Sequence, residues 1–108
     1  MTTAAGGRGG SRRDREAMHL KLYVAARSAN SMRAVANLRA LFLGRRERPR
    51  LDIVDVFASA EEALAAGIIV TPTLVKLSPH PTIRIVGDLS DRLAVMTALG
   101  LDPDEVPP

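Results

Sequence analysis

Val70-Thr71-Pro72-Thr73-Leu74-Val75 sets a proline, flanked by threonines, at the start of an apolar run. Proline has no backbone N–H and cannot donate to a strand ladder, so within a sheet it occupies the first residue of a strand or an edge. The apolar residues after it favour a strand. We therefore predict that Pro72 leads into a strand over 73–77.

N-terminal to this stretch, the pattern predicts a strand and a helix. Segment 19–25 alternates polar and apolar residues and is rich in strand formers, which predicts a strand that is half-exposed at its start and buried by its end. Ser28 or Asn30 then caps a helix over 31–43, and Gly44 is a suitable stop. Apolar residues at spacings of three and four fall on one face of this helix: Met32, Val35, Leu38, Leu41 and Phe42.

Three strands and a short helix are expected between the first helix and residue 86. Segment 51–57 is almost continuously apolar, which predicts a central strand covered on both faces. Ser59-Ala60-Glu61-Glu62 resembles a helix start with acids in the first turn, and this helix ends near Gly67. Strands over 73–77 and 82–86 are joined by a proline-rich loop and form an antiparallel hairpin.

A final helix follows the turn Gly87-Asp88-Leu89-Ser90-Asp91. Asp88 or Ser90 is the expected cap, with Asp91 in the first turn. One stripe of this helix carries Leu89, Leu93, Met96 and Leu99. The complete order is βαβαββα with a mixed four-stranded sheet, which is the thioredoxin-like topology of the α/β class.

This topology gives Pro72 a further meaning. In thioredoxin-like domains the proline at this place has a cis peptide bond and faces the first helix, where the redox cysteines would lie. The chain has no cysteine. Dithiol chemistry and thiolate metal sites are therefore excluded, and function is expected to lie in surface and conformation.

Composition predicts a single domain over 18–101 between two tails. Residues 1–17 are rich in Gly, Ser, Arg and Thr and are expected to be disordered, and 102–108 carry three prolines and are expected to be flexible. The N-terminal segment has no apolar core of the kind that secretory signals and membrane anchors need. We expect a soluble, cytoplasmic protein that does not interact with membranes.

Charge and histidine content point away from nucleic acid and metal. Thirteen of the 15 basic residues are arginine, and the densest run, 45–50, is expected to be a solvated loop. Only three aromatic residues are present, which are too few for a base-stacking platform. His19 and His80 lie far apart in the sequence without ligand-spaced carboxylates, so we expect no metal or cofactor.

Five segments also carry a family resemblance in their order and spacing. They are Leu20-Lys21-Leu22-Tyr23-Val24-Ala25, Asn30-Ser31 with Arg33-Ala34, Ile53-Val54-Asp55-Val56, Thr71-Pro72-Thr73-Leu74, and Ile85-Val86-Gly87-Asp88-Leu89-Ser90-Asp91-Arg92. Together these segments, from about 20 to 99, closely resemble the KaiB family of clock proteins. The resemblance implies a non-enzymatic adaptor that binds the ATPase ring of the hexameric KaiC kinase and helps to switch it from phosphorylation to dephosphorylation. A KaiA-like protein or a histidine-kinase output protein is an additional implied partner.

The resemblance also implies two folds: a tetrameric ground state with a rearranged second half, and a thioredoxin-like monomer that binds KaiC. Ala98 stands where many relatives have glycine, and Gly100 stands where they have an acidic residue. Alanine is better than glycine inside a helix by about 0.5–1 kcal/mol. We therefore predict that the thioredoxin-like form dominates, with Pro72, Gly87, Asp88, Ala98 and Gly100 as the conformational residues.

Two groups of residues are candidates for partner binding. Asn30, Arg33, Thr71, Pro72 and Thr73 are expected to converge on one end of the sheet, where their alternative role is to form caps and a rigid turn. The resemblance implies that KaiC contacts the second helix and its neighbouring strand, with the candidates Glu61, Glu62, Ala66, Gly67 and Ile68. Gly67 departs from the lysine that is common there.

An alternative function also fits the sequence. It is a cysteine-free thioredoxin-like enzyme or thiol-ligand binder that holds a substrate backbone near Pro72.

Overall fold

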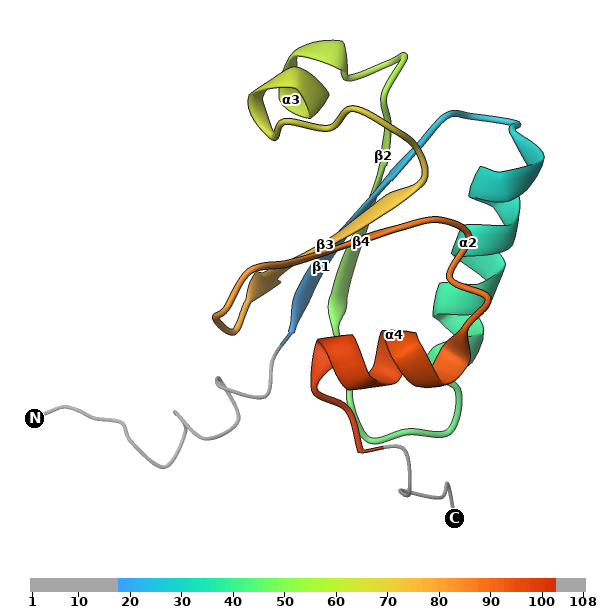
Figure 1. Cartoon of the computed structure of the whole chain (residues 1–108), viewed down its shortest axis with the longest axis vertical. Helices are drawn as coiled ribbons and strands as arrows, with labels where there is room; N and C mark the ends of the chain where they lie inside the picture. The colour runs from blue at the N-terminus through green and yellow to red at the C-terminus, as the bar shows by residue number, and fades with distance from the viewer. Residues whose placement is uncertain (1–17, 103–108) are drawn as a thin grey trace, which may run out of the picture.

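Seven helices and strands follow one another in the computed structural model of the chain, which describes residues 18–102 (Figure 1). They are β1 (His19–Val24), α2 (Ala29–Leu41), β2 (Arg50–Asp55), α3 (Ala60–Ala65), β3 (Thr73–Ser78), β4 (Ile83–Val86) and α4 (Arg92–Leu99). The predicted tail 1–17 lies outside the described residues, as does the predicted tail 102–108 apart from Asp102. The described elements confirm the βαβαββα order.

The four strands form one mixed sheet in the order β2-β1-β3-β4. β1 pairs in parallel with β2 and antiparallel with β3, which in turn pairs antiparallel with β4. This is the thioredoxin-like arrangement that the sequence predicted. The prediction that β2 is a central strand is wrong, because β1 takes the place between β2 and β3. Asp52 and Asp55 suit a half-exposed edge, and only Val54 of β2 is buried.

The core has two parts, one on each face of the sheet. Leu20, Leu22 and Leu74 are completely buried and pack in the larger cluster with residues of α2 and α4. Tyr23, Val54 and Val75 form the smaller cluster with Ala63 of α3. Figure 1 shows the same division, with α2 and α4 on one side of the sheet and α3 near one end of the other side.

The buried faces of the two long helices differ from the predicted stripes. Met32 is 63% exposed and Leu93 is 61% exposed, so both assignments were wrong. In α2, Leu38 and Leu41 are buried as predicted, but in the first half of the helix Ser31 and Ala34 are the buried residues. Ser31 turns inward there, and its Oγ accepts the Ala25 N–H at 3.0 Å. In α4, Met96 and Leu99 are buried as predicted, and Val95 is buried where Leu93 was expected to be. Leu89 is also buried, but it precedes the helix.

Capping side chains fix where α2 and α4 begin. Ser28 is the N-cap of α2, and its Oγ accepts the Ser31 N–H at 3.0 Å. Asp91, and not Asp88 or Ser90, is the N-cap of α4, where its Oδ1 accepts the Ala94 N–H at 3.1 Å. The expected cap was wrong because the Asp88 carboxylate accepts from the Ser90 N–H inside the preceding turn.

Replacing Ser28 by alanine is expected to lower the free energy of unfolding by about 1 kcal/mol, because the Ser31 N–H loses its acceptor. Ser59 provides a matched control, since it precedes α3 without a side-chain capping hydrogen bond. Ser59→Ala is therefore expected to change stability by less than about 0.5 kcal/mol. Denaturant unfolding of both variants checks this, and equal losses would contradict the capping role of Ser28.

Arg45 corrects the prediction that 45–50 is a solvated loop. This side chain is buried, with 3% exposure, and its Nε donates to Glu47 Oε1 at 2.9 Å. Its Nη2 donates to the Asp102 backbone oxygen at 3.2 Å, which ties the loop after α2 to the residues after α4. Arg46 and Arg48 are exposed, as the prediction had it.

No helix within residues 18–102 is both long and apolar enough to cross a membrane.

Candidate functional site

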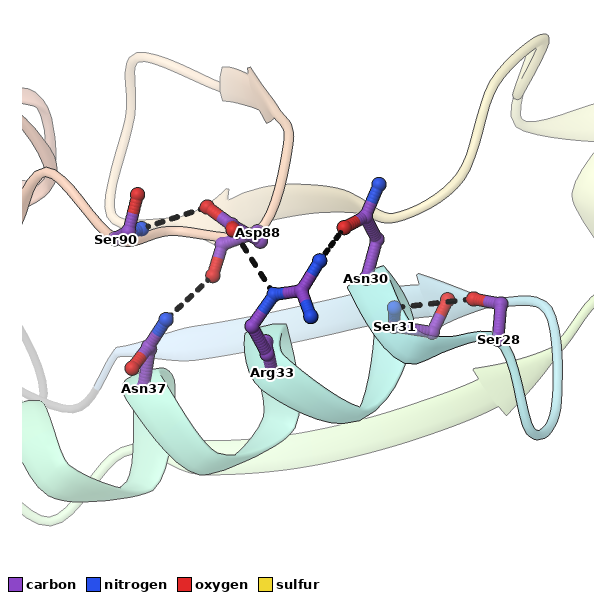
Figure 2. A network of polar contacts seen from close by, with 7 residues as sticks. All are labelled: Ser28, Asn30, Ser31, Arg33, Asn37, Asp88 and Ser90. Carbon is purple, nitrogen blue, oxygen red and sulfur yellow. Dashed lines mark hydrogen bonds and ion pairs between the residues drawn. The ribbon is translucent and has the colours of Figure 1, made fainter.

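The structure separates the candidate residues into two surfaces on opposite sides of the sheet. The first joins the N-terminal half of α2 to the turn between β4 and α4, and its residues are shown in Figure 2. The second surrounds α3, which lies near one end of the other face in Figure 1. These surfaces correspond to the two groups of candidates named from the sequence, one at an end of the sheet and one at the second helix.

In the first surface, two residues of α2 hold the Asp88 turn (Figure 2). The Arg33 guanidinium contacts Asn30 Oδ1, and its Nε donates to Asp88 Oδ2 at 3.3 Å. Asn37 Nδ2 donates to the Asp88 backbone oxygen at 2.8 Å. The structure thus brings Asn30, Arg33 and Asp88 together. Asn37 was not predicted, because in the sequence it looks like an ordinary polar residue of a helix.

The Thr71-Pro72-Thr73 segment binds the start of the same turn through its backbone. The Thr71–Pro72 peptide bond is cis, as the thioredoxin-like topology implied. The Pro72 oxygen accepts the Gly87 N–H at 2.9 Å, and Thr73 Oγ1 donates to the Val70 oxygen at 2.7 Å. Pro72 and Thr73 are buried, so a partner would meet Asn30, Arg33 and the half-buried Thr71 at this end.

The turn that these contacts hold has an uncommon backbone. Gly87 has φ +117° and Leu89 has φ +64°. A bulky side chain in the left-handed region is strained. Leu89 nevertheless adopts it, and its side chain is buried in the larger core cluster. Core burial of Leu89 and the two α2 side chains on Asp88 therefore fix the direction in which the chain enters α4.

Hydrogen bonds from Ser90, and then the Arg33 guanidinium, hold the pKa of Asp88 below its usual range. Because the pKa is lower in the folded state, the ionised Asp88 stabilises the fold at pH values above the ordinary pKa of aspartate, which is about 4. This stabilisation is lost as the pH falls through the folded-state pKa. We expect an NMR titration of the Asp88 carboxyl carbon to show a midpoint below that of an unfolded peptide. In Arg33→Gln the midpoint should move part of the way upward, because the Ser90 contacts remain. An unchanged midpoint would contradict a role for Arg33.

The second surface is an exposed apolar patch around α3. Its members come from the β2–α3 turn, from α3 and from the loop before β3, and we call them the α3 patch: Phe57 (76% exposed), Leu64 (75%), Ile69 (93%) and Val70 (48%). None of these four was among the predicted binding residues. The signal in the sequence was the pair Ile69-Val70, which continues an apolar run into a loop after Gly67.

The residues predicted to bind in the α3 region are different from those of the α3 patch, and several of them contact the core or the sheet. Ala66 and Ile68 are half-buried against the smaller core cluster. Glu62 pairs with Lys21 of β1, and this hydrogen bond is the main cause that raises the pKa of Lys21. Glu61 is exposed, and Gly67 has φ +72° at the end of the helix.

His19 has an acidic neighbour that the sequence spacing did not reveal. Pairing of β1 with β2 brings His19 Nε2 within 2.8 Å of Asp52 Oδ2, and this contact is the main cause that lowers the pKa of Asp52. Among residues 18–102 no group of three or more His, Cys, Asp or Glu side chains is arranged to hold a metal ion.

The sequence is similar to a group of clock proteins. Residues 21–101 match the KaiB domain family. The "Circadian clock oscillator protein KaiB" of Prochlorococcus marinus strain MIT 9313 is 46% identical over 88 residues, which are 81% of this chain and 74% of that protein. The protein with the same description from Parasynechococcus marenigrum strain WH8102 is 44% identical over 88 residues, which are 81% and 85% of the two chains.

Solved structures agree with the fold. The N-terminal domain of Synechococcus elongatus SasA superposes with a TM-score of 0.67 at 21% identity, over 98% of this chain and 97% of that one. Mitochondrial thioredoxin 3 of Saccharomyces cerevisiae gives 0.63 at 19% identity, over 78% of each chain. These two show the thioredoxin-like fold alone, while the sequence relatives and the domain match show the family. The chain belongs to the KaiB family of circadian clock proteins.

Proposed function

We propose that this protein is a non-enzymatic regulator that binds the ATPase ring of a KaiC-type clock kinase and modulates its phosphorylation cycle. Family membership supports this class of partner. The observation that carries the proposal is the α3 patch, because it offers a docking surface in the thioredoxin-like form of the chain. A KaiA-like protein and a histidine-kinase output protein are further proposed partners, and we place the complex in the cytoplasm.

The α3 patch has the composition of a docking surface. Concentrations of exposed apolar side chains mark interaction sites, and the four of the α3 patch all lie within the segment 57–70. Phe57 supplies an aromatic ring of the kind that is enriched at the centres of interfaces. Glu61 is exposed on the first turn of α3 and adds a charged rim. A partner with an apolar surface and a basic edge fits this arrangement.

The surface formed by the start of α2 and Pro72 supports a role without catalysis. A thiol-dependent enzyme of this topology needs a nucleophile or an activating hydroxyl near Pro72, and the chain has no cysteine. The hydroxyl oxygens of Ser28 and Ser31 both accept backbone hydrogen bonds at 3.0 Å. Ser28 caps α2 and Ser31 binds the backbone before the helix, so both hydroxyls have structural partners, which favours the adaptor over the thiol-ligand alternative.

A pull-down with a KaiC-type ATPase from the same source tests the proposal, performed with ATP and then with ADP and followed by sizing of the complex. We expect binding to the hexamer that depends on the nucleotide. Absence of binding in both states would overturn the proposed partner. Glutathione retention by the same preparation would instead support the thiol-ligand alternative.

A further inference from the structure

Helix α3 has few contacts of its own to fix its position. It comprises only the six residues Ala60–Ala65, of which Ala63 is the buried one. Ser59 makes no side-chain capping hydrogen bond, and α3 has no basic residue in its last turn. Helices this short are unstable without tertiary support. The α3 patch therefore depends on groups that reach α3 from the sheet.

A row of three residues crosses the sheet next to α3. Lys21 of β1 is registered with Val75 of β3, and Val75 is registered with Arg84 of β4. Residues in register across neighbouring strands point to the same face of a sheet. Val75 packs in the cluster that contains Ala63 of α3. Lys21 and Arg84 therefore lie on the two sides of Val75, which packs with α3.

The two cations bind different parts of the α3 segment. Lys21 pairs with Glu62 in the first turn. The Arg84 guanidinium donates to the backbone oxygens of Ala66 and Gly67, the latter from Nη1 at 3.3 Å. These carbonyls follow the last turn of α3, where partial negative charge from the helix dipole favours a cation. The φ of +72° at Gly67 turns the chain so that both oxygens reach the same guanidinium.

We propose that Arg84 is a positioning residue for the α3 patch. Resting on the proposed function, the inference assigns to this β4 side chain the task of holding the C-terminal end of α3. Leu64 and Ile69 flank Ala66 and Gly67 in the sequence, so the Arg84 contacts fix the position of these two patch residues, which the partner would bind. Arg84 itself need not touch the partner, because its guanidinium bonds are made within the chain.

Amide hydrogen exchange in the isolated protein tests the positioning without any partner. The reporters are the amides of Ala66, Gly67 and Ile68, which donate to α3 oxygens. In Arg84→Gln we expect them to exchange about tenfold faster relative to the amide of Leu22, since two hydrogen bonds to a charged group are lost. Arg46→Gln removes one positive charge from an exposed loop and should leave the reporters unchanged. Equal reporter rates in Arg84→Gln and the unchanged protein would overturn the inference.

Binding to the KaiC-type ATPase is the second readout. We expect Arg84→Gln to weaken binding about tenfold and Arg84→Lys to recover part of it, because lysine keeps the charge but cannot donate to two carbonyls in the fixed fork of arginine. Full affinity of Arg84→Gln together with faster exchange would show that α3 position does not matter to the partner and would overturn the inference. If the unchanged protein does not bind at all, the proposed partner fails, while the exchange result still decides whether Arg84 positions α3.

Discussion

Replacing Ile69 by aspartate is expected to weaken binding to a KaiC-type ATPase by about 30-fold or more while leaving the fold intact. Ile69 is 93% exposed in the α3 patch, so the substitution removes no core contact. A carboxylate inside an apolar interface loses its hydration without a partner, and changes at the centre of such interfaces cost about 2 kcal/mol or more, which is about 30-fold in affinity. Stability should change by no more than about 0.5 kcal/mol, as is usual for surface positions.

Titration of the ATPase with the variant, alongside denaturant unfolding, measures both quantities. Leu43→Asp is the matched control, because Leu43 is 73% exposed and follows α2, on the other side of the sheet from α3. It introduces the same charge and removes a similar exposed side chain. We expect its affinity to equal that of the unchanged protein. Equal losses for the two variants would point to a general charge effect and contradict docking through the α3 patch.

Local signals in the sequence were sufficient for most of the topology. The proline before Thr73 and the periodicity of α2 each depend on a few neighbouring residues, and both elements were placed within a few positions of their observed bounds. The order of the strands was harder. An apolar run signals burial but not which strand lies in the middle, and so the edge position of β2 was missed.

The candidate site was predicted less completely, because its contacts join distant parts of the chain. Arg33 and Asp88 were each singled out, yet Asn37, which bonds to the same turn, looks like an ordinary polar residue of a helix. The register that aligns Lys21 with Arg84 through Val75 exists only once the sheet has formed. The α3 patch shows the same limit, since sequence alone does not separate an exposed apolar residue from a buried one.

We expect substitutions in α4 to change the balance between the thioredoxin-like form and the tetrameric form that the resemblance implies. Ala98 lies inside α4 and lines the hollow between β4 and this helix. Gly100 ends the helix with φ +77°, and its N–H donates to the Thr97 oxygen at 3.1 Å. Both residues favour α4, since alanine is a better helix former than glycine and glycine adopts a positive φ without strain.

The double variant Ala98→Gly with Gly100→Asp is therefore expected to shift the protein toward the tetrameric fold that the family resemblance implies. The glycine costs α4 about 1 kcal/mol, and an aspartate at positive φ costs about 1 kcal/mol more. Together these changes alter the ratio of the two forms by about 30-fold, provided that the alternative fold lacks α4. Size-exclusion chromatography should show a larger tetramer fraction. NMR amides over 94–99 should change from helical to strand-like shifts in that fraction.

A general loss of stability has to be separated from a change of fold, and α2 offers the means. Ala36 is an exposed residue inside α2, which lies in the first half of the chain. Ala36→Gly therefore carries a helix penalty similar to that of Ala98→Gly. That half is expected to be common to both folds, and the variant should lower the free energy of unfolding without raising the tetramer fraction. An unchanged protein that is already mostly tetrameric, with strand-like shifts over 94–99, would contradict the bias that Ala98 and Gly100 are expected to create. If Ala36→Gly raises the tetramer fraction as much as the double variant does, the choice of fold depends on overall stability and not on α4.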